Sequence, residues 1–198
     1  MKRLLPIITL LVAGFTSTAE AQPLMNYTYA DAAYQWIGID QQGYGDSNGL
    51  DSKLSYSPVE HFALEGGYNY LSTKFNPGDI KTRQHLFTYG GAGWYSVCKG
   101  LDLVGRVGGV SGRLNYTGDG YDESFTDNGV YAGGSVRYLV AEEFEADLNV
   151  TYQNLNSSSW LYSATGLYAI HENIALKGDV GIDNDKNVYL TGGFRFAM

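Results

Sequence analysis

The sequence predicts an all-β fold, a transmembrane antiparallel up-and-down β-barrel of ten strands, and three observations lead to it. Apolar and polar side chains alternate with a period of two along most of the chain beyond residue 22. The connections between the alternating segments are short at one end and longer and polar at the other. One face of every segment is apolar, whereas the opposite face is glycine-rich and carries charges of both signs, as a narrow lumen requires.

The first 21 residues are predicted to be a cleaved signal peptide. Lys2 and Arg3 precede a short apolar run over residues 4–15, and Ala19-Glu20-Ala21 fits the small-x-small pattern of a cleavage site. A membrane anchor is the alternative, but the apolar run is short for a helix that spans a bilayer. A single barrel domain is therefore expected over residues 22–198.

Composition excludes some classes of partner. Removing Lys2, Arg3 and Glu20 from the 13 basic and 21 acidic residues leaves 11 and 20, a net charge of −9. A nucleic-acid partner needs a basic stripe and is excluded.

Cys98 is the single cysteine. This rules out an internal disulfide, and Cys98 is most simply a free thiol. The 26 glycines, 17 tyrosines and only 4 prolines favour strands over helices.

Ten alternating segments are expected, each bounded by turn signals. They cover residues 26–39, 48–58, 62–72, 83–95, 101–115, 128–140, 144–154, 158–170, 174–183 and 187–198. A count of eight stays open if residues 154–170 are divided once too often. The short connections read "SPVEH", "SVCKG", "VAEE" and "HEN"; the polar ones are predicted loops at 40–49, 72–83 and 117–128, followed by "LNSSS" and "DNDKN". This asymmetry is typical of outer-membrane barrels.

A weak repeat marks the short turns. An aromatic residue, a short turn and an alternating run recur in "YSPVEHFALEGGY", "YSVCKGLDLVGRVG", "YLVAEEFEADLNV" and "YAIHENIALKGDVG". The repeated tyrosines are Tyr56, Tyr95, Tyr138 and Tyr168. Because they fall at one height, they are predicted to form an aromatic girdle at a membrane interface.

The polar face predicts an ion-pair network inside the barrel. A barrel of about ten strands has a lumen largely filled by side chains, and a charge buried there without a partner is costly. The predicted members are Asp31, Lys53, Glu65, Arg106, Arg137, Asp147, Lys177, Asp179 and Arg195. Arg106 is the expected partner of Glu65. A narrow channel for small solutes is the alternative reading of the same polar face.

The chain ends in "TGGFRFAM". Thr191, Gly193 and Phe196 match a barrel-assembly signal of a polar residue, a glycine and two spaced aromatics, and Met198 replaces the final aromatic. With this ending, the chain resembles the small outer-membrane β-barrel family that includes OmpX-like and OmpA-barrel-like proteins. The resemblance covers everything after the signal peptide. It implies a monomer in the cell outer membrane, with the bilayer, lipopolysaccharide and the barrel-assembly machinery as partners.

No catalytic residue, cofactor or metal site is predicted, and a structural or surface-interaction role is expected. A rim-active hydrolase is the least favoured alternative: His61 and His171 lie in short turns, and His85 should point outward. The carboxylates and hydroxyls at the rim that such an enzyme would use are Asp183, Asp185 and Ser157 to Ser159. Calcium binding by Asp119, Asp122, Glu123 and Asp127 stays open, although acidic loops are usually just solvated.

Overall fold

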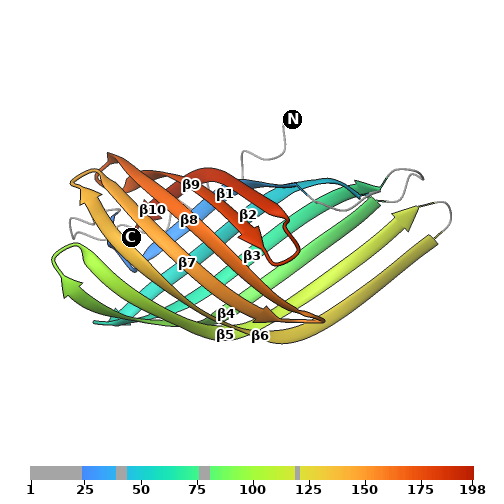
Figure 1. Ribbon diagram of the computed structural model, residues 1–198, viewed down its shortest axis with the longest axis horizontal. Coiled ribbons are helices and arrows are strands. Elements are labelled where there is room, and N and C mark those ends of the chain that lie inside the picture. Colours follow the sequence, from blue (N-terminus) through green and yellow to red (C-terminus); the bar gives the residue numbers. More distant parts are fainter. Residues whose placement is uncertain (1–23, 39–43, 76–80, 119–120) are drawn as a thin grey trace.

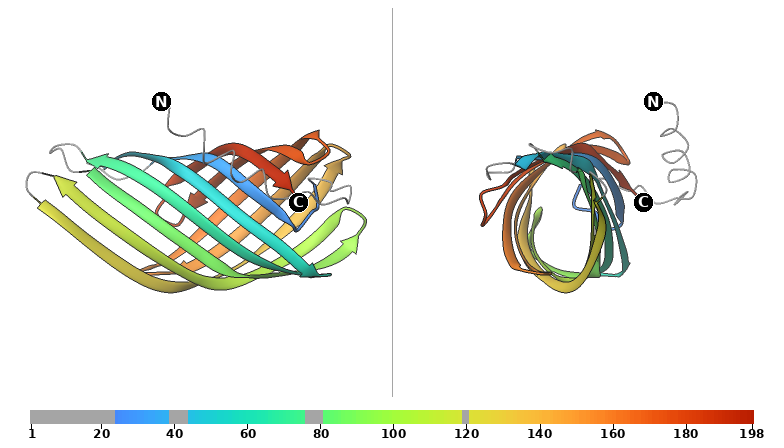
Figure 2. Two further views of the ribbon diagram at one scale, coloured as in Figure 1. Left: turned by 180° about the vertical axis from the view of Figure 1, so that it is seen from behind. Right: turned by 90° about the vertical axis from the view of Figure 1, so that its right-hand side faces the viewer.

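The computed structural model is a closed antiparallel barrel in which each strand pairs with the next and β10 closes on β1 (Figures 1 and 2). It describes residues 24–38, 44–75, 81–118 and 121–198. The strands are β1 (Tyr29–Gly38), β2 (Tyr44–Val59), β3 (Phe62–Phe75), β4 (Lys81–Cys98), β5 (Leu101–Gly118), β6 (Tyr121–Ala141), β7 (Phe144–Asn154), β8 (Ser158–His171), β9 (Ile174–Asp183) and β10 (Val188–Ala197). The prediction of ten strands is confirmed and the count of eight is wrong. The predicted signal peptide lies outside the described residues and stays a prediction.

Within those same ranges, the chain contains no helix with the length and apolar character needed to cross a membrane.

The wall of the barrel is uneven in height. Strands β4, β5 and β6 have 18, 18 and 21 residues, whereas β1, β9 and β10 have 10 each. Strands β2 to β6 all run well past β7 to β10 at the end opposite the C-terminus (Figure 1). We call the part of β2–β6 beyond the ends of β7–β10 the raised wall; within it, β4 is paired with β3 and β5 along its whole length.

The raised wall corrects the predicted loops. Most of residues 117–128 is strand, since β5 ends at Gly118 and β6 begins at Tyr121, and β2 begins at 44 rather than 48. Strand also extends into both ends of the predicted loop at 72–83. With water on both faces, such a strand has no reason to alternate apolar and polar residues, so its polar composition resembles that of a loop.

The two faces of the barrel invert the usual distribution of polarity. Leu64 and Leu148 point outward and are more than half exposed, whereas the largest fully buried side chains include Arg137 and Glu145. Glycines give the inward side chains room: a Cβ on Gly90 would lie 2.7 Å from the Tyr131 hydroxyl, and one on its partner Gly108 would lie 2.6 Å from the Tyr131 ring. The barrel therefore has an apolar outside and a charged interior.

Candidate functional site

Asp31 on β1 is the centre of one charge cluster in the lumen. Its Oδ1 accepts a hydrogen bond from Arg195 Nε at 2.8 Å, and its Oδ2 accepts one from Arg195 Nη2 at 2.9 Å and one from Lys177 Nζ at 3.0 Å. The Arg195 guanidinium also lies over the Tyr29 ring, 3.8 Å from its centre. Asp31 is only 3% exposed. Two cations thus share one buried carboxylate.

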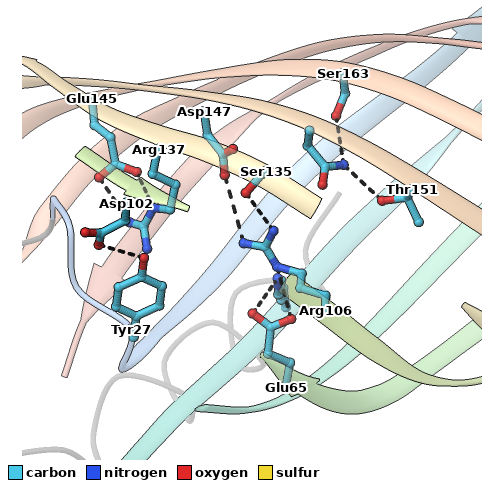
Figure 3. A network of polar contacts seen from close by, with 12 residues as sticks. Tyr27, Glu65, Asp102, Arg106, Ser135, Arg137, Glu145, Asp147, Thr151 and Ser163 are labelled. Carbon is cyan, nitrogen blue, oxygen red and sulfur yellow. Dashed lines mark hydrogen bonds and ion pairs between the residues drawn. The ribbon is translucent and has the colours of Figure 1, made fainter. Parts of the chain in front are cut away.

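A second cluster surrounds Glu65 on β3. Lys53 Nζ lies 2.9 Å from Glu65 Oε1, and Arg106 Nε lies 3.5 Å from Oε2. Arg106 also donates to Ser135 Oγ at 2.8 Å and lies 4.0 Å from Asp147 (Figure 3). Lys53, on the adjacent strand, is therefore a closer partner of Glu65 than Arg106, which is two strands away.

The third cluster lies near the short turns. Arg137 donates to both carboxylate oxygens of Glu145, at 2.8 and 3.1 Å, from the neighbouring strand (Figure 3). Both residues are almost fully buried. Glu145 Oε2 also accepts the backbone N–H of Met25 at 2.6 Å, so the cluster holds a segment that precedes β1.

That segment, Leu24–Thr28, crosses the lumen at the short-turn end, and we call it the N-terminal plug. Leu24 is buried against inward side chains of β6, β8 and β9, which are Leu139, Leu167, Ala169 and Ala175. Tyr27 is buried against residues of β3, β4 and β5, which are Ala63, Ala92, Trp94 and Val104. The plug therefore contacts opposite sides of the barrel.

Tyr27 anchors the plug in several ways. Its ring stacks on Trp94 with centroids 3.7 Å apart, and the Arg137 guanidinium lies 4.4 Å from the ring centre. Its hydroxyl donates to Asp102 at 2.8 Å. Burial raises the pKa of the Tyr27 phenol, which therefore keeps the proton that it donates.

The plug was not predicted from the sequence, because the first strand was expected to begin at residue 26, whereas β1 begins at Tyr29. The sequence pattern does distinguish the plug from the strand. The inward residues of β1 are odd-numbered, such as Asp31 and Ala33, so the apolar Leu24, three residues before Tyr27, does not continue the period of two.

Two connected chambers remain within the lumen. The one nearer the short turns, which we call the lower chamber, is about 260 Å³ and is lined by the Asp31 and Glu65 clusters. The one nearer the long loops, about 360 Å³, is lined largely by amides, hydroxyls and aliphatic side chains, and the two share Lys53, Thr88, Thr151 and Gln153. Asp179 lines the lower chamber but takes part in none of the ion pairs above. The structure thus groups the other predicted network residues into three clusters and leaves Asp179 apart.

Among the described residues, the rim side chains that a hydrolase was predicted to use do not come together. Asp183 accepts hydrogen bonds from Asp185, Asn187 and Tyr189, so it organises the β9–β10 turn. His85 points outward and pairs with the Tyr68 hydroxyl at 2.8 Å. Ser159 contacts Asn184 in the same turn region. Asp183 and His85 are therefore engaged separately, on opposite faces of the wall.

The proposed calcium ligands are also separated. Asp122 and Glu123 are successive residues of β6 and therefore point to opposite faces, and Asp119 lies outside the described residues. Across the part of the chain that the structure describes, no group of three or more His, Cys, Asp or Glu side chains is placed to hold a metal ion.

The chain end lies on the strand that closes the barrel. Thr191, Gly193 and Phe196 belong to β10, and Phe194 and Phe196 share its outer face. Met198 follows the strand and donates its N–H to Thr28 O at 3.1 Å. Its reading as an assembly signal stays a prediction.

The family described as outer membrane protein beta-barrel domain matches residues 7–196, nearly the whole chain. The chain belongs to this family. It is accordingly a protein of the cell outer membrane, as the sequence predicted. Outer membrane protein A of Shigella dysenteriae is 27% identical over 175 residues, which cover 78% of this chain and 49% of that protein. The chain thus spans about half the length of the curated relatives it matches.

Two solved structures share the fold. The translocator domain of the autotransporter NalP from Neisseria meningitidis has a TM-score of 0.55 at 11% identity, covering 98% of this chain and 93% of that one. The beta domain of the Bordetella autotransporter BrkA has a TM-score of 0.50 at 12% identity, covering 86% and 98%. At these identities the likeness concerns the fold alone.

Proposed function

We propose that this outer-membrane barrel is a non-enzymatic surface-interaction protein that uses its raised wall to bind an extended polypeptide outside the cell. The observation that carries the proposal is an open strand edge. β6 pairs with β5 from Tyr121 to Tyr138, but with β7 only from Val130 onward. Residues 121–129 therefore have a strand neighbour on one side only, and an exposed edge accepts an added strand through backbone hydrogen bonds.

One hydrogen bond shows which residues of β6 turn their backbone N–H and C=O groups toward the open edge. Leu139 N donates to Gly100 O at 2.7 Å, toward β5. Because backbone groups alternate sides along a strand and the β5–β6 register is unbroken, odd-numbered residues of β6 bond to β5. The backbone groups of Asp122, Ser124, Thr126 and Asn128 therefore face the open edge. Extracellular loops are the longer ones in such barrels, which puts this edge outside the cell.

Proline at the open edge is expected to weaken peptide binding. A Ser124→Pro, Thr126→Pro double variant removes two edge N–H donors and leaves the ladder to β5 intact. Peptides selected from a phage-displayed library on the refolded barrel in lipid nanodiscs should bind this variant about 30-fold more weakly, since two hydrogen bonds contribute roughly 1 kcal/mol each. Fluorescence anisotropy of the labelled peptides measures the change.

The matched control is Ser124→Ala with Thr126→Ala, which removes the same side chains and keeps both N–H groups. It should bind the selected peptides as the parent protein does. Equal affinity of the proline variant, or equal weakening by both double variants, would contradict binding through the strand edge.

The channel alternative has less support. The N-terminal plug crosses one end of the lumen, and the ion pairs of Asp31 and Glu65 occupy its middle. Ions need a continuous aqueous path, which barrels of 16–18 strands provide.

We also propose that the protein is a monomer and that the barrel-assembly machinery inserts it into the membrane by reading the end of β10.

Planar-bilayer recording tests the closed lumen. We expect no discrete conductance steps from the refolded protein, because the plug and the charge clusters occupy the lumen. A 16-stranded porin in the same bilayers supplies the positive control. Reproducible steps from the intact barrel, with a size that follows the salt concentration, would favour the narrow channel instead.

A further inference from the structure

The cations of this acidic protein are unevenly distributed. Of the 11 lysines and arginines beyond residue 21, five lie in the lumen clusters: Lys53, Arg106, Arg137, Lys177 and Arg195. Lys99 and Lys186 lie in turns at opposite ends of the barrel. The remaining four, Lys74, Lys81, Arg83 and Arg113, lie together on the outer surface of β3, β4 and β5. We call these four the basic patch.

Strand register brings the basic patch together. Lys74 is directly opposite Lys81, and Arg113 is directly opposite His85, two residues from Arg83. Paired strands are about 4.8 Å apart, so these side chains are neighbours on one face. All four share the outer face with Tyr70 and Phe87, since side chains alternate along each strand and Arg83 and Arg113 are exposed.

The protein supplies the patch with little counter-charge. None of the ion pairs within 4.0 Å in the described parts of the chain involves these four residues. Two acids lie near the same face: Asp122 of β6, which is opposite Thr117 and two strands from Lys81, and the exposed Asp46 of β2, which precedes the Ser47 that pairs with Thr73. Neither lies within 4.0 Å of a patch cation. Like charges directly opposite on a sheet are destabilising. An external anion would relieve the repulsion between Lys74 and Lys81.

The height of the patch selects the anion. Ten residues of β4 separate Tyr95, beside a short turn, from His85, which is about 33 Å along a strand. At a tilt of about 40° this is about 25 Å along the membrane normal, the height of the apolar band of such barrels. Tyr68, Tyr70, His85 and Phe87 form an aromatic cluster at this level. The basic patch therefore begins where the apolar band ends, at the headgroups of the outer leaflet.

We propose that Lys74, Lys81, Arg83 and Arg113 bind the phosphate groups of a phosphorylated outer-leaflet lipid, lipopolysaccharide, whose acyl chains lie against the aromatic cluster below them. The site rests on the outer-membrane location and is independent of the strand edge of β6. Arginine and lysine on adjacent strands supply several donors to the phosphate oxygens, and the aromatic rings supply the apolar contact.

The test compares lipid binding by charge-neutralised variants. The barrel is refolded in phosphatidylcholine vesicles with increasing fractions of lipopolysaccharide, and its unfolding temperature is followed by the heat-modified shift on gels. Native protein should be stabilised, and the effect should weaken with salt. A Lys81→Gln, Arg83→Gln, Arg113→Gln variant should need on the order of 100-fold more lipopolysaccharide, at roughly fivefold for each basic residue removed near an anionic surface.

The control variant, Lys99→Gln with Lys186→Gln, neutralises the two cations outside both the lumen and the patch and should respond like the native protein. Lipopolysaccharide with its phosphates removed enzymatically should stabilise the native protein far less. An unchanged response of the triple variant, equal losses in both variants, or equal stabilisation by dephosphorylated lipid would overturn the proposal. Full stabilisation by inorganic phosphate alone would overturn it too, because it would assign the patch to a free anion.

Discussion

Replacing Asp31 with asparagine is expected to lower the free energy of unfolding by about 3–5 kcal/mol, the cost typical of removing one partner from a buried ion pair. The amide keeps the size of the side chain but leaves Arg195 and Lys177 in the lumen without the carboxylate that they share. Urea unfolding of the barrel in lipid vesicles, followed by tryptophan fluorescence, measures the loss.

Asp179→Asn is the matched control for this experiment. Asp179 lines the same chamber but makes none of the ion pairs, so the same chemical change there should cost much less. Similar losses in both variants would mean that the lumen responds to net charge rather than to the geometry around Asp31.

A second large effect is expected from Arg137→Ala. The substitution leaves Glu145 buried without its cation and removes the guanidinium over Tyr27, so unfolding should again become easier by about 3–5 kcal/mol. It should also loosen the N-terminal plug. In a protein with Trp36 and Trp160 changed to phenylalanine, the remaining Trp94 stacks on Tyr27, so its emission reports the position of the plug.

The paired variant Arg137→Met, Glu145→Leu separates the two effects. With both charges of the pair gone, neither residue leaves its partner buried as an uncompensated ion, and most of the stability should return, since apolar replacement of a whole buried pair is often neutral. If the paired variant were as unstable as Arg137→Ala, the uncompensated charge of Glu145 would not be the cause. An unshifted Trp94 emission in Arg137→Ala would show that Arg137 does not hold the plug.

The barrel was predictable because the bilayer imposes a strict alternation on every strand that crosses it. Leu64 next to Glu65 and Val136 next to Arg137 each place an apolar side chain outside and a charge inside. The same rule failed above the membrane. Residues 121–129 have water on both faces, so Asp122, Glu123 and Ser124 follow no pattern, and the strand was taken for a loop.

The lumen residues were predictable as a set, but their partners were not. Alternation says that Glu65, Lys53 and Arg106 all point inward. It does not give the register between strands, which decides that Lys53 is the nearer cation. The role of Tyr27 could not be predicted from the sequence, because this residue precedes β1 and follows no strand pattern. Its contacts with Trp94 and Asp102 depend on where the chain enters the closed barrel.

The plug also has a mechanical consequence. A ring of ten strands deforms most readily by flattening, which brings one pair of opposite walls together and moves the other pair apart. Leu24 is packed against β6, β8 and β9, while Tyr27, three residues away, is packed against β3, β4 and β5. The segment between them is thus a brace across the diameter. The cross-section cannot become oval at this end without separating one of these contacts, whereas the raised wall at the other end, held along β6 from one side only, is free to bend.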